Sequence, residues 1–278
     1  MAQEQSSMEF ACITTTTDYG HTDAFASVLN AQLKYVFPQV TIIEVSHNIR
    51  KYDIRQAAYI LRSSYRFFPM ATLHLLDVSS SRYAAPDHLF FEFNGHFFVV
   101  PDNGVASLIT LGAPAVYYRV PEGGGVKGGS FRMLTEVLPS LAGLREASNP
   151  HEALGEPASD VFMHLVPTPF VRDNILQAQV VHVDGYENLI TNIDQPLFIR
   201  FLDPGDGWQL LLKKTFSDAE AVRKLSNSVD DVEPGAVACY FGFDNMLHLG
   251  IRCGKAASLL GMKVDDALFI EKWSRSSH

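Results

Sequence analysis

The pattern of apolar residues changes once along this chain, near residue 170, and this change limits the possible folds more than any other feature. Before it, strand-like and helix-like stretches alternate; after it, mainly short strand-like stretches recur. Alternating strands and helices are typical of an α/β domain, whereas closely spaced short strands are typical of a barrel or sandwich. We therefore predict an α/β domain over residues 1–172 with a mostly parallel central sheet, followed by a smaller β-barrel domain over residues 173–278.

The individual elements follow from the spacing of apolar residues and from turn signals. In the first domain the predicted strands are Phe10–Thr15, Val40–Val45, Thr72–Val78 and a hairpin, His88–Phe93 with His96–Val100, that turns at Asn94-Gly95. The predicted helices there are Asp23–Val36, Asp53–Tyr65 and Met133–Leu144. In the second domain the predicted strands are Ala178–Val183, Trp208–Leu212, Ala236–Tyr240, Met246–Ile251 and Ala267–Lys272, with short helices at Asp218–Lys224 and Ala256–Leu260.

Composition narrows the functional classes. The net charge is −9 and the basic residues are scattered, so no basic face for nucleic acid is expected. No apolar run approaches the roughly 18–20 residues that span a bilayer, and the amino terminus lacks signal-peptide regions, so we expect a cytoplasmic protein without a membrane segment. Cys12, Cys239 and Cys253 form no CxxC pair, which fits reduced thiols, and the histidines form no zinc motif, so no metal is expected.

One polar stretch lies where an α/β sheet would bind a ligand. Thr14–Thr17 and then Asp18 place hydroxyls and a carboxylate at the end of a predicted strand, just before a helix. Ligands bind at the carboxyl ends of strands in such sheets, so Asp18 could accept hydrogen bonds from ribose hydroxyls, with Asp23 assisting. Such residues more often have a structural role, which would make Asp18 a turn residue and Asp23 a helix cap.

Other polar features have an ordinary structural interpretation. Residues 101–104, Pro-Asp-Asn-Gly, are a strong turn signal, and Asn188 lies in a polar cluster that opens the second domain. His47 and His74 lie at or within apolar strands, as core histidines do. The triple glycine at 123–125 lacks the strand–glycine–helix setting of a phosphate-binding loop. None of these features points to a ligand by itself.

Six stretches, in order over nearly the whole chain, resemble the S-adenosylmethionine hydrolase (adenosine-forming) family, also called SAM hydroxide adenosyltransferases, which includes the fluorinases and chlorinases. The stretches and the family motifs they resemble are 13–23 (I-T-x-T-T-D-F-G-x-x-D), 41–61 (I-V-D-I-T-H-x-I-x-P-x-D-I-x-x-A-A), 68–74 (F-P-x-G-T-V-H), 98–104 (ending P-D-N-G), 183–193 (D-x-F-G-N-L-I-T-N-I) and 247–268 (L-E-I-A-I-N-x-G-x-A-A-x-L-L-G-L-x-x-G-D).

This resemblance implies an N-terminal α/β domain and a C-terminal β-barrel assembled as a homotrimer, with each site between one subunit's first domain and the next subunit's second domain. It implies an adenosine-type ligand, foremost S-adenosylmethionine, and no separate cofactor. The positions it assigns to the ligand are Asp18 at the ribose, Asp23 in the pocket wall, Asp184 and Asn188 at the methionine end and the base, and the backbone of 252–254, which includes Cys253, at the adenine edge.

The resemblance fails at the catalytic positions. Hydrolases of the family use an Asp, an Arg and a His to position water or hydroxide for attack on the ribose C5′. Without gaps, Ser79 stands at the Asp position, and Asp77 lies two residues earlier. Arg82 is near, but not at, the Arg position. Arg132 stands where the His is expected, either lining the pocket, where its charge would disfavour a sulfonium ligand, or facing solvent.

Three possibilities therefore remain open. The first is hydrolysis of S-adenosylmethionine, or substitution at C5′ of a related sulfonium nucleoside, by an altered set of residues. The alternative is a non-catalytic protein that binds or senses adenosine or S-adenosylmethionine. A different substrate is a third possibility, because Phe243 and Asp244 replace a small hydroxyl residue and its neighbour at the methionine end, and Phe243 makes that end more apolar.

Overall fold

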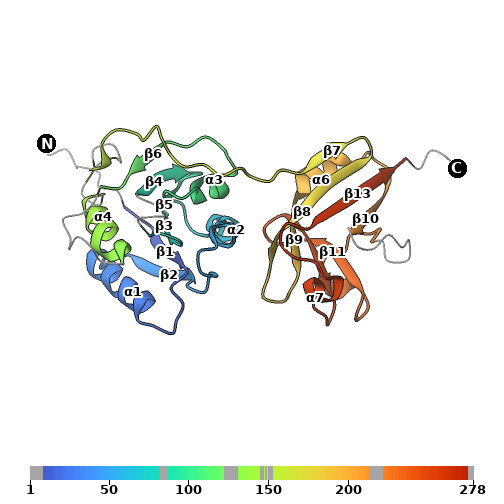
Figure 1. Cartoon of the computed structure of the whole chain (residues 1–278), viewed down its shortest axis with the longest axis horizontal. Coiled ribbons are helices and arrows are strands. Elements are labelled where there is room, and N and C mark those ends of the chain that lie inside the picture. Colours follow the sequence, from blue (N-terminus) through green and yellow to red (C-terminus); the bar gives the residue numbers. More distant parts are fainter. Residues whose placement is uncertain are drawn as a thin grey trace. The chain divides into compact units, whose positions relative to one another are not determined.

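The computed structural model describes residues 9–81, 87–121, 131–144, 147, 149, 153–212 and 222–274. The chain divides into two units, Met1–Val166 and Pro167–His278, and each is described by itself (Figure 1). Among the helices of these residues, none is both long and apolar enough to cross a membrane.

A six-stranded sheet runs through the first unit in the order β2-β1-β3-β5-β4-β6. Its strands are β1 (Cys12–Thr17), β2 (Thr41–Ser46), β3 (Leu73–Asp77), β4 (His88–Phe93), β5 (His96–Pro101) and β6 (Tyr117–Arg119). Strands β2, β1, β3 and β5 are parallel, whereas β4 is antiparallel to both β5 and β6. The sheet is therefore mixed, and its antiparallel part begins at the predicted hairpin, where Asn94 and Gly95 both have positive φ.

Helices cover both faces of this sheet (Figure 1). On one face α2 (Ile54–Ser64) and α3 (Val105–Thr110) pack on an apolar cluster that includes Leu76 and Phe98. On the other face α1 (Phe25–Val36) and α4 (Leu138–Leu144) pack on a cluster that includes Leu75 and Val99. A 3₁₀ turn, Tyr65–Phe67, follows α2, and a π-helical turn, Met133–Val137, leads into α4. Neighbouring residues of β3 and β5 point to opposite faces, as the strand period of two requires.

The second unit is built on an antiparallel sheet with the path β10-β13-β8-β9-β12-β11, and β7 also pairs with β8. Its strands are β7 (Phe170–Arg172), β8 (Ile175–Val183), β9 (Leu189–Asp194), β10 (Gly207–Leu212), β11 (Val237–Phe241), β12 (Met246–Ile251) and β13 (Ala267–Trp273). The first half of β8 pairs with β13 and its second half with β9, so the sheet curls around this strand. In the described residues the end strands β10 and β11 do not pair, so the sheet is a half-barrel.

Short helices accompany this sheet. They are α6 (Gln195–Phe201), α7 (Ala256–Leu260) and a 3₁₀ turn at Val229–Asp231. The predicted helix at 218–224 lies mostly outside the described residues, and Val222 instead forms an isolated β-bridge with Leu210. The core of the unit includes Leu176, Leu189 and Leu249 from three neighbouring strands of the path.

His74 is a core histidine, as predicted. It is fully buried in β3, and its ring joins two partners: Nδ1 lies 2.7 Å from the Thr14 hydroxyl and Nε2 lies 3.2 Å from Nδ1 of His96. Its ring also stacks on Phe98. Burial, followed by the charge of the neighbouring His96, lowers the pKa of His74 to about 3. The neutral imidazole is therefore part of the folded core.

This shift predicts that acid weakens the first unit. An unfolded histidine takes up a proton near pH 6.5, whereas folded His74 does so only near its pKa of about 3, so stability falls as the pH falls between these values. Lowering the pH from 8 to 5 should cost about 2 kcal/mol through His74 alone. Urea unfolding at both pH values checks this. His74→Gln should lose less stability than wild type on acidification, and the control His164→Gln, at an exposed histidine of the same unit, should lose as much as wild type.

Candidate functional site

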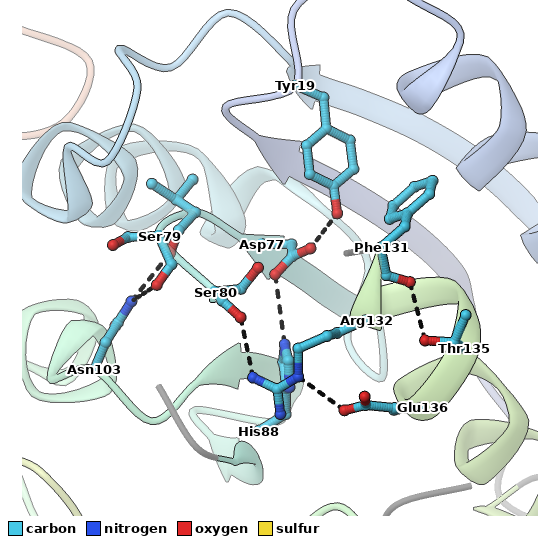
Figure 2. Close-up of polar contacts among 11 residues, drawn as sticks. Tyr19, Asp77, Ser79, Ser80, His88, Asn103, Phe131, Arg132, Thr135 and Glu136 are labelled. Atoms are coloured by element: carbon cyan, nitrogen blue, oxygen red, sulfur yellow. Dashed lines mark hydrogen bonds and ion pairs between the residues drawn. The ribbon is translucent and has the colours of Figure 1, made fainter. Parts of the chain in front are cut away.

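Polar groups gather at the carboxyl end of the parallel strands in the first unit. Thr17 and Asp77 are register partners in the last rungs of β1 and β3. The loop that begins at Asp18 follows β1, a serine loop follows β3, and Asn103 follows β5. Ligands of open α/β sheets bind outside the carboxyl ends of the strands, in the crevice that forms where the strand order reverses. These residues form the candidate site of the first unit, and Figure 2 shows the part of it around Asp77.

Asp77 is the central group of this cluster. It is only 2% exposed, and its two oxygens have different partners: the Tyr19 hydroxyl donates to Oδ2, and Nε2 of buried His88 lies 3.4 Å from Oδ1. Burial by itself raises the pKa of Asp77, but the hydrogen bond and charge of His88, with hydrogen bonds from Ser80 and Tyr19, outweigh it and hold the pKa below its ordinary value. Asp77 is therefore a buried, ionised carboxylate.

Tyr19 reaches Asp77 from the loop after β1, and aromatic neighbours fix its ring. The ring lies edge-on to Phe131 at 5.1 Å and parallel to the imidazole of His47 at 6.4 Å. His47 is fully buried, with Nδ1 2.7 Å from the Thr17 hydroxyl, and so is a core histidine as predicted. Burial, followed by the charge of Asp77, raises the pKa of Tyr19 far above its ordinary value, so its hydroxyl stays protonated.

The serine loop after β3 is held in a turned conformation. Ser79 has a φ of 54°, in the left-handed region that residues with a side chain seldom adopt. Nδ2 of Asn103 donates to the carbonyl oxygens of Val78 and Ser79, at 3.0 and 3.2 Å, and its Oδ1 accepts from the backbone N–H of Val105 at 3.2 Å. Asn103, from the predicted Pro-Asp-Asn-Gly turn, thus ties the serine loop to the start of α3.

Arg132 is buried rather than facing solvent, so the solvent-facing interpretation is wrong. It is 5% exposed, and its Nε donates to Oε2 of Glu136 at 2.8 Å while Nη1 donates to the carbonyl oxygen of Ser80 at 3.0 Å. Figure 2 shows Arg132 beside Ser80 and His88, at the same edge as Asp77. Because a carboxylate lies next to the guanidinium, its charge is compensated locally and repels a sulfonium less than a lone arginine would. Arg82 lies outside the described residues.

Asp18 and Asp23 have different surroundings. Oδ2 of Asp18 accepts from the backbone N–H of Tyr52 at 2.9 Å, and the Lys51 ammonium donates to the Asp18 carbonyl. Asp18 therefore does hold a turn, between the loop after β1 and the start of α2. Asp23 is exposed, and it is not the cap of α1, because that helix begins after Ala24 without a side-chain cap. The helix-cap interpretation of Asp23 is wrong.

In the second unit, Asp184 and Asn188 build one turn. Oδ1 of Asp184 accepts from the backbone N–H groups of Tyr186 and Asn188, at 2.9 and 2.8 Å, and its Oδ2 accepts from Nδ2 of Asn188 at 2.9 Å. Asn188 and Cys253 line a pocket of about 800 Å³, within the roughly 300–1,000 Å³ of small-molecule sites. Cys253 is exposed, whereas Cys12 and Cys239 are buried.

Phe243 and Asp244 lie at the other end of β12 from this pocket. They precede Met246, where β12 begins, whereas the pocket is lined by Ile251, where β12 ends, and by the residues after it. Phe243 is 71% exposed. Oδ1 of Asp244 lies 2.9 Å from Nε2 of buried His248, and it also accepts from the backbone N–H of Met246. Within this unit, therefore, Asp184, Asn188 and Cys253 come together and Phe243 and Asp244 do not join them.

Three residues of the first-unit cluster are not predicted from the sequence: Tyr19, His88 and Glu136. Tyr19 carried one readable signal, because the family motif has phenylalanine at this position and the tyrosine adds a hydroxyl. His88 and Glu136 have no such signal in the sequence. His88 meets Asp77 only in the folded sheet, and Glu136 meets Arg132 one helical turn away. Within the described residues, no group of three or more His, Cys, Asp or Glu side chains is placed to hold a metal ion.

Comparison with known protein families identifies the family of this chain. Residues 13–126 match the SAM hydroxide adenosyltransferase N-terminal domain, and residues 178–269 match the C-terminal domain of the same family. The two matches together cover most of the chain. The chain belongs to the SAM hydroxide adenosyltransferase family.

Similar proteins include curated and solved relatives at low identity. The chain is 24% identical over 263 residues to the (R)-S-adenosyl-L-methionine hydrolase of Salinispora tropica, covering 92% of this chain and 96% of the relative. The protein of the same name from Thermus thermophilus is 23% identical over 261 residues, covering 89% and 94%. A solved uncharacterized conserved protein from Thermotoga maritima shares the fold, with a TM-score of 0.79 at 22% identity over 93% of this chain and 99% of that one.

Proposed function

We propose that this protein binds S-adenosylmethionine and hydrolyses it to adenosine and methionine, with Asp77 in place of the family's catalytic carboxylate. The observation that carries the proposal is the buried, ionised Asp77 at the carboxyl edge of the sheet, in a chain of the SAM hydroxide adenosyltransferase family. Ser79, the ungapped match to that carboxylate, has no acidic group. In this proposal Asp77 supplies the negative charge that Ser79 cannot supply.

The chemistry makes modest demands on the protein. A sulfonium is a good leaving group, so attack on the ribose C5′ needs mainly an oriented nucleophile in a site from which bulk water is excluded. Asp18, which lies in the loop after β1 and directly precedes Tyr19, would bind the ribose hydroxyls. In this proposal Arg132 is a positioning residue, because it reaches the backbone of Ser80 and is neutralised by Glu136.

Incubation of the protein with S-adenosylmethionine tests this proposal. We expect adenosine and methionine to form in equal amounts, measured by liquid chromatography, faster than in a reaction without protein. The Asp77→Asn variant keeps the size of the side chain and should lose most of this rate. Product formation at the uncatalysed rate with the wild-type protein would reject the hydrolase assignment.

A second candidate is binding without catalysis, which one observation favours. Both oxygens of Asp77 already have partners within the protein, and so does the guanidinium of Arg132. Because these polar groups already bond to one another, they need no bound substrate to complete their hydrogen bonds. Calorimetry with adenosine and with S-adenosylmethionine discriminates the two functions. Binding of either compound with no product would support the sensor, and protection of the exposed Cys253 thiol from alkylation would locate the ligand at the second-unit pocket.

The ribose role of Asp18 predicts a specific loss of affinity. Asp18→Asn should weaken nucleoside binding by about 1.5–3 kcal/mol, the range for hydrogen bonds to a charged group. The amide oxygen can still accept from the Tyr52 N–H, so the variant should keep the fold, which circular dichroism checks. Asp173→Asn, at an exposed hairpin in the second unit, is the matched control. If both variants bind as wild type does, Asp18 serves only its turn.

The proposal also includes assembly and location. We propose a homotrimer, on the resemblance alone, and light scattering should then give about three times the 30.8 kDa of one chain. A clean monomer that still binds adenosine would reject this state. A cytoplasmic location is proposed because the three cysteines are free thiols, which persist in reducing compartments.

A further inference from the structure

Asp77 cannot meet a substrate directly in the observed arrangement. It is 2% exposed, and each of its oxygens faces another side chain of the protein. Tyr19, in contrast, is only partly buried and lies on the loop that begins with Asp18. Of the Tyr19 and His88 side chains that contact the Asp77 oxygens, Tyr19 is therefore the partly exposed one, and its hydroxyl is the end that lies in the buried cluster. A phenol is both a donor and an acceptor, so while its hydrogen points to Asp77 its oxygen can still accept a hydrogen bond.

We infer that Tyr19 is a catalytic residue of the proposed hydrolysis, and that it relays a proton from the attacking water to Asp77. This inference rests on the proposed function and names the residue that contacts the nucleophile. It follows from the Tyr19–Asp77 hydrogen bond, from the burial of Asp77, and from the place of both at the carboxyl edge of β1 and β3.

The relay balances without any further reactant. The water oxygen forms a bond to C5′ while the bond from C5′ to the sulfonium sulfur breaks, and that electron pair stays on the sulfur of methionine. One proton of the water passes to the Tyr19 oxygen as the phenolic proton passes to Oδ2 of Asp77. The products are adenosine, methionine and a protonated Asp77, which afterwards returns its proton to solvent through the same tyrosine.

The protonation states fit this order of events. Burial and the charge of Asp77 raise the pKa of Tyr19, so a free phenolate does not form, and the tyrosine gives up its proton only as it receives another. His88 is a positioning residue here, because its Nε2 lies beside Oδ1 and its hydrogen bond favours the ionised carboxylate that accepts the proton. General acid–base relays of this kind contribute roughly 10²–10⁴-fold to a rate.

The ring of Tyr19 is held in place for this role. Phe25 and Phe131 contact it at ring distances of 6.1 and 5.1 Å, and the His47 imidazole lies parallel to it. The backbone N–H of Tyr19 also donates to the hydroxyl of Thr17 at 3.2 Å. A phenylalanine would keep these ring contacts and lose only the hydroxyl. Tyr19→Phe is therefore a clean test of the hydroxyl.

The experiment compares S-adenosylmethionine turnover by wild type, Tyr19→Phe, Asp77→Asn and a control, Tyr35→Phe, whose side chain is 82% exposed on α1. The relay predicts that Tyr19→Phe and Asp77→Asn each lower kcat by about 10²–10⁴-fold, with KM nearly unchanged and Tyr35→Phe equal to wild type. His88→Gln should lower kcat less, and it should move the acidic limb of the kcat–pH profile to higher pH, because His88 lowers the pKa of Asp77. Loss of folded protein alone would lower kcat without moving that limb.

The other outcomes decide against the relay. If Tyr19→Phe turns over as fast as wild type, the hydroxyl has no part in the reaction. If it is faster, Tyr19 is a cap that restrains Asp77, and the relay is wrong while the hydrolase assignment stands. If wild type forms no product, the hydrolase assignment fails and the relay falls with it. Circular dichroism confirms the fold of each variant. If Tyr19→Phe does not fold, the wild-type rate in mixtures of H2O and D2O carries the test: the relay moves two protons in one step and predicts a curved dependence on deuterium fraction, whereas a linear dependence means one proton and overturns the relay.

Discussion

Replacing Glu136 with alanine is expected to lower the free energy of unfolding by about 3–5 kcal/mol, the cost of removing one partner from a buried ion pair. Arg132 is 5% exposed, and its Nε lies 2.8 Å from the Glu136 carboxylate one helical turn away. Without that carboxylate the guanidinium keeps its burial and loses its nearest negative charge, because arginine cannot deprotonate to escape the penalty.

The matched control removes both charges. Arg132→Met combined with Glu136→Leu replaces the pair with apolar side chains of similar size, and such exchanges are often neutral or stabilising. Urea unfolding followed by far-UV circular dichroism gives the comparison. Both tryptophans, Trp208 and Trp273, lie in the second unit, so the fluorescence transition reports on that unit and serves as an internal reference. A double variant as unstable as Glu136→Ala would show that the pair itself stabilises the protein.

Much of the fold could be predicted because local sequence and tertiary environment agree. The helix Ile54–Ser64 has apolar residues at helical spacing and starts at Asp53, whose carboxylate accepts from the Gln56 N–H at 2.9 Å. Strand β3 reads as a continuous apolar run and is buried on both faces, as central parallel strands are. The Asn94-Gly95 hairpin is the strongest short-range turn signal in the chain.

The missed elements are short or have few apolar residues. Strand β9, Leu189–Asp194, is not predicted from the sequence, because Thr191, Asn192 and Asp194 interrupt its apolar residues. In the structure Thr191 is nevertheless fully buried in the sheet. Helix α6 follows directly, and its start was readable. Asp194 caps it by accepting from the Leu197 N–H at 2.7 Å, with Pro196 in the first turn. Seven residues were too few for a periodic signal.

The candidate site was harder to predict than the fold. The sequence predicts Asp18 at the end of a strand, and it offers Asp77 as an alternative to Ser79 at the position of the family's catalytic carboxylate. It could not show that Asp77 meets Tyr19, 58 positions away, or His88 on the neighbouring hairpin, because those contacts arise only from the order of strands in the sheet. The sequence also does not show that Arg132 is buried with its partner Glu136, because charged residues at i, i+4 spacing are common on exposed helix faces as well.

Gly104→Ala is expected to destabilise the first unit by about 2–5 kcal/mol, from two causes that a neighbouring glycine separates. Gly104, which ends the Pro-Asp-Asn-Gly turn and begins α3, has a φ of 89°, and an L side chain in that region costs about 1–2 kcal/mol. A Cβ there would also lie 2.2 Å from Cδ2 of His164 and 2.9 Å from Cδ1 of Phe162, an overlap that typically costs about 1–3 kcal/mol.

Gly112, just beyond the other end of α3, provides the control. Its φ is 73°, and a Cβ there would meet nothing within 4 Å, so Gly112→Ala carries the conformational cost alone. The difference between the two variants in urea unfolding therefore measures the contact with the segment at 162–164. That segment is held by hydrogen bonds from the Phe162 N–H to Asp102 and from the His164 N–H to Ser107, at 2.9 and 2.8 Å. If Gly104→Ala displaces it, hydrogen exchange at Phe162 and His164 should accelerate, whereas equal losses in the two variants would mean that the turn tolerates a side chain against this segment.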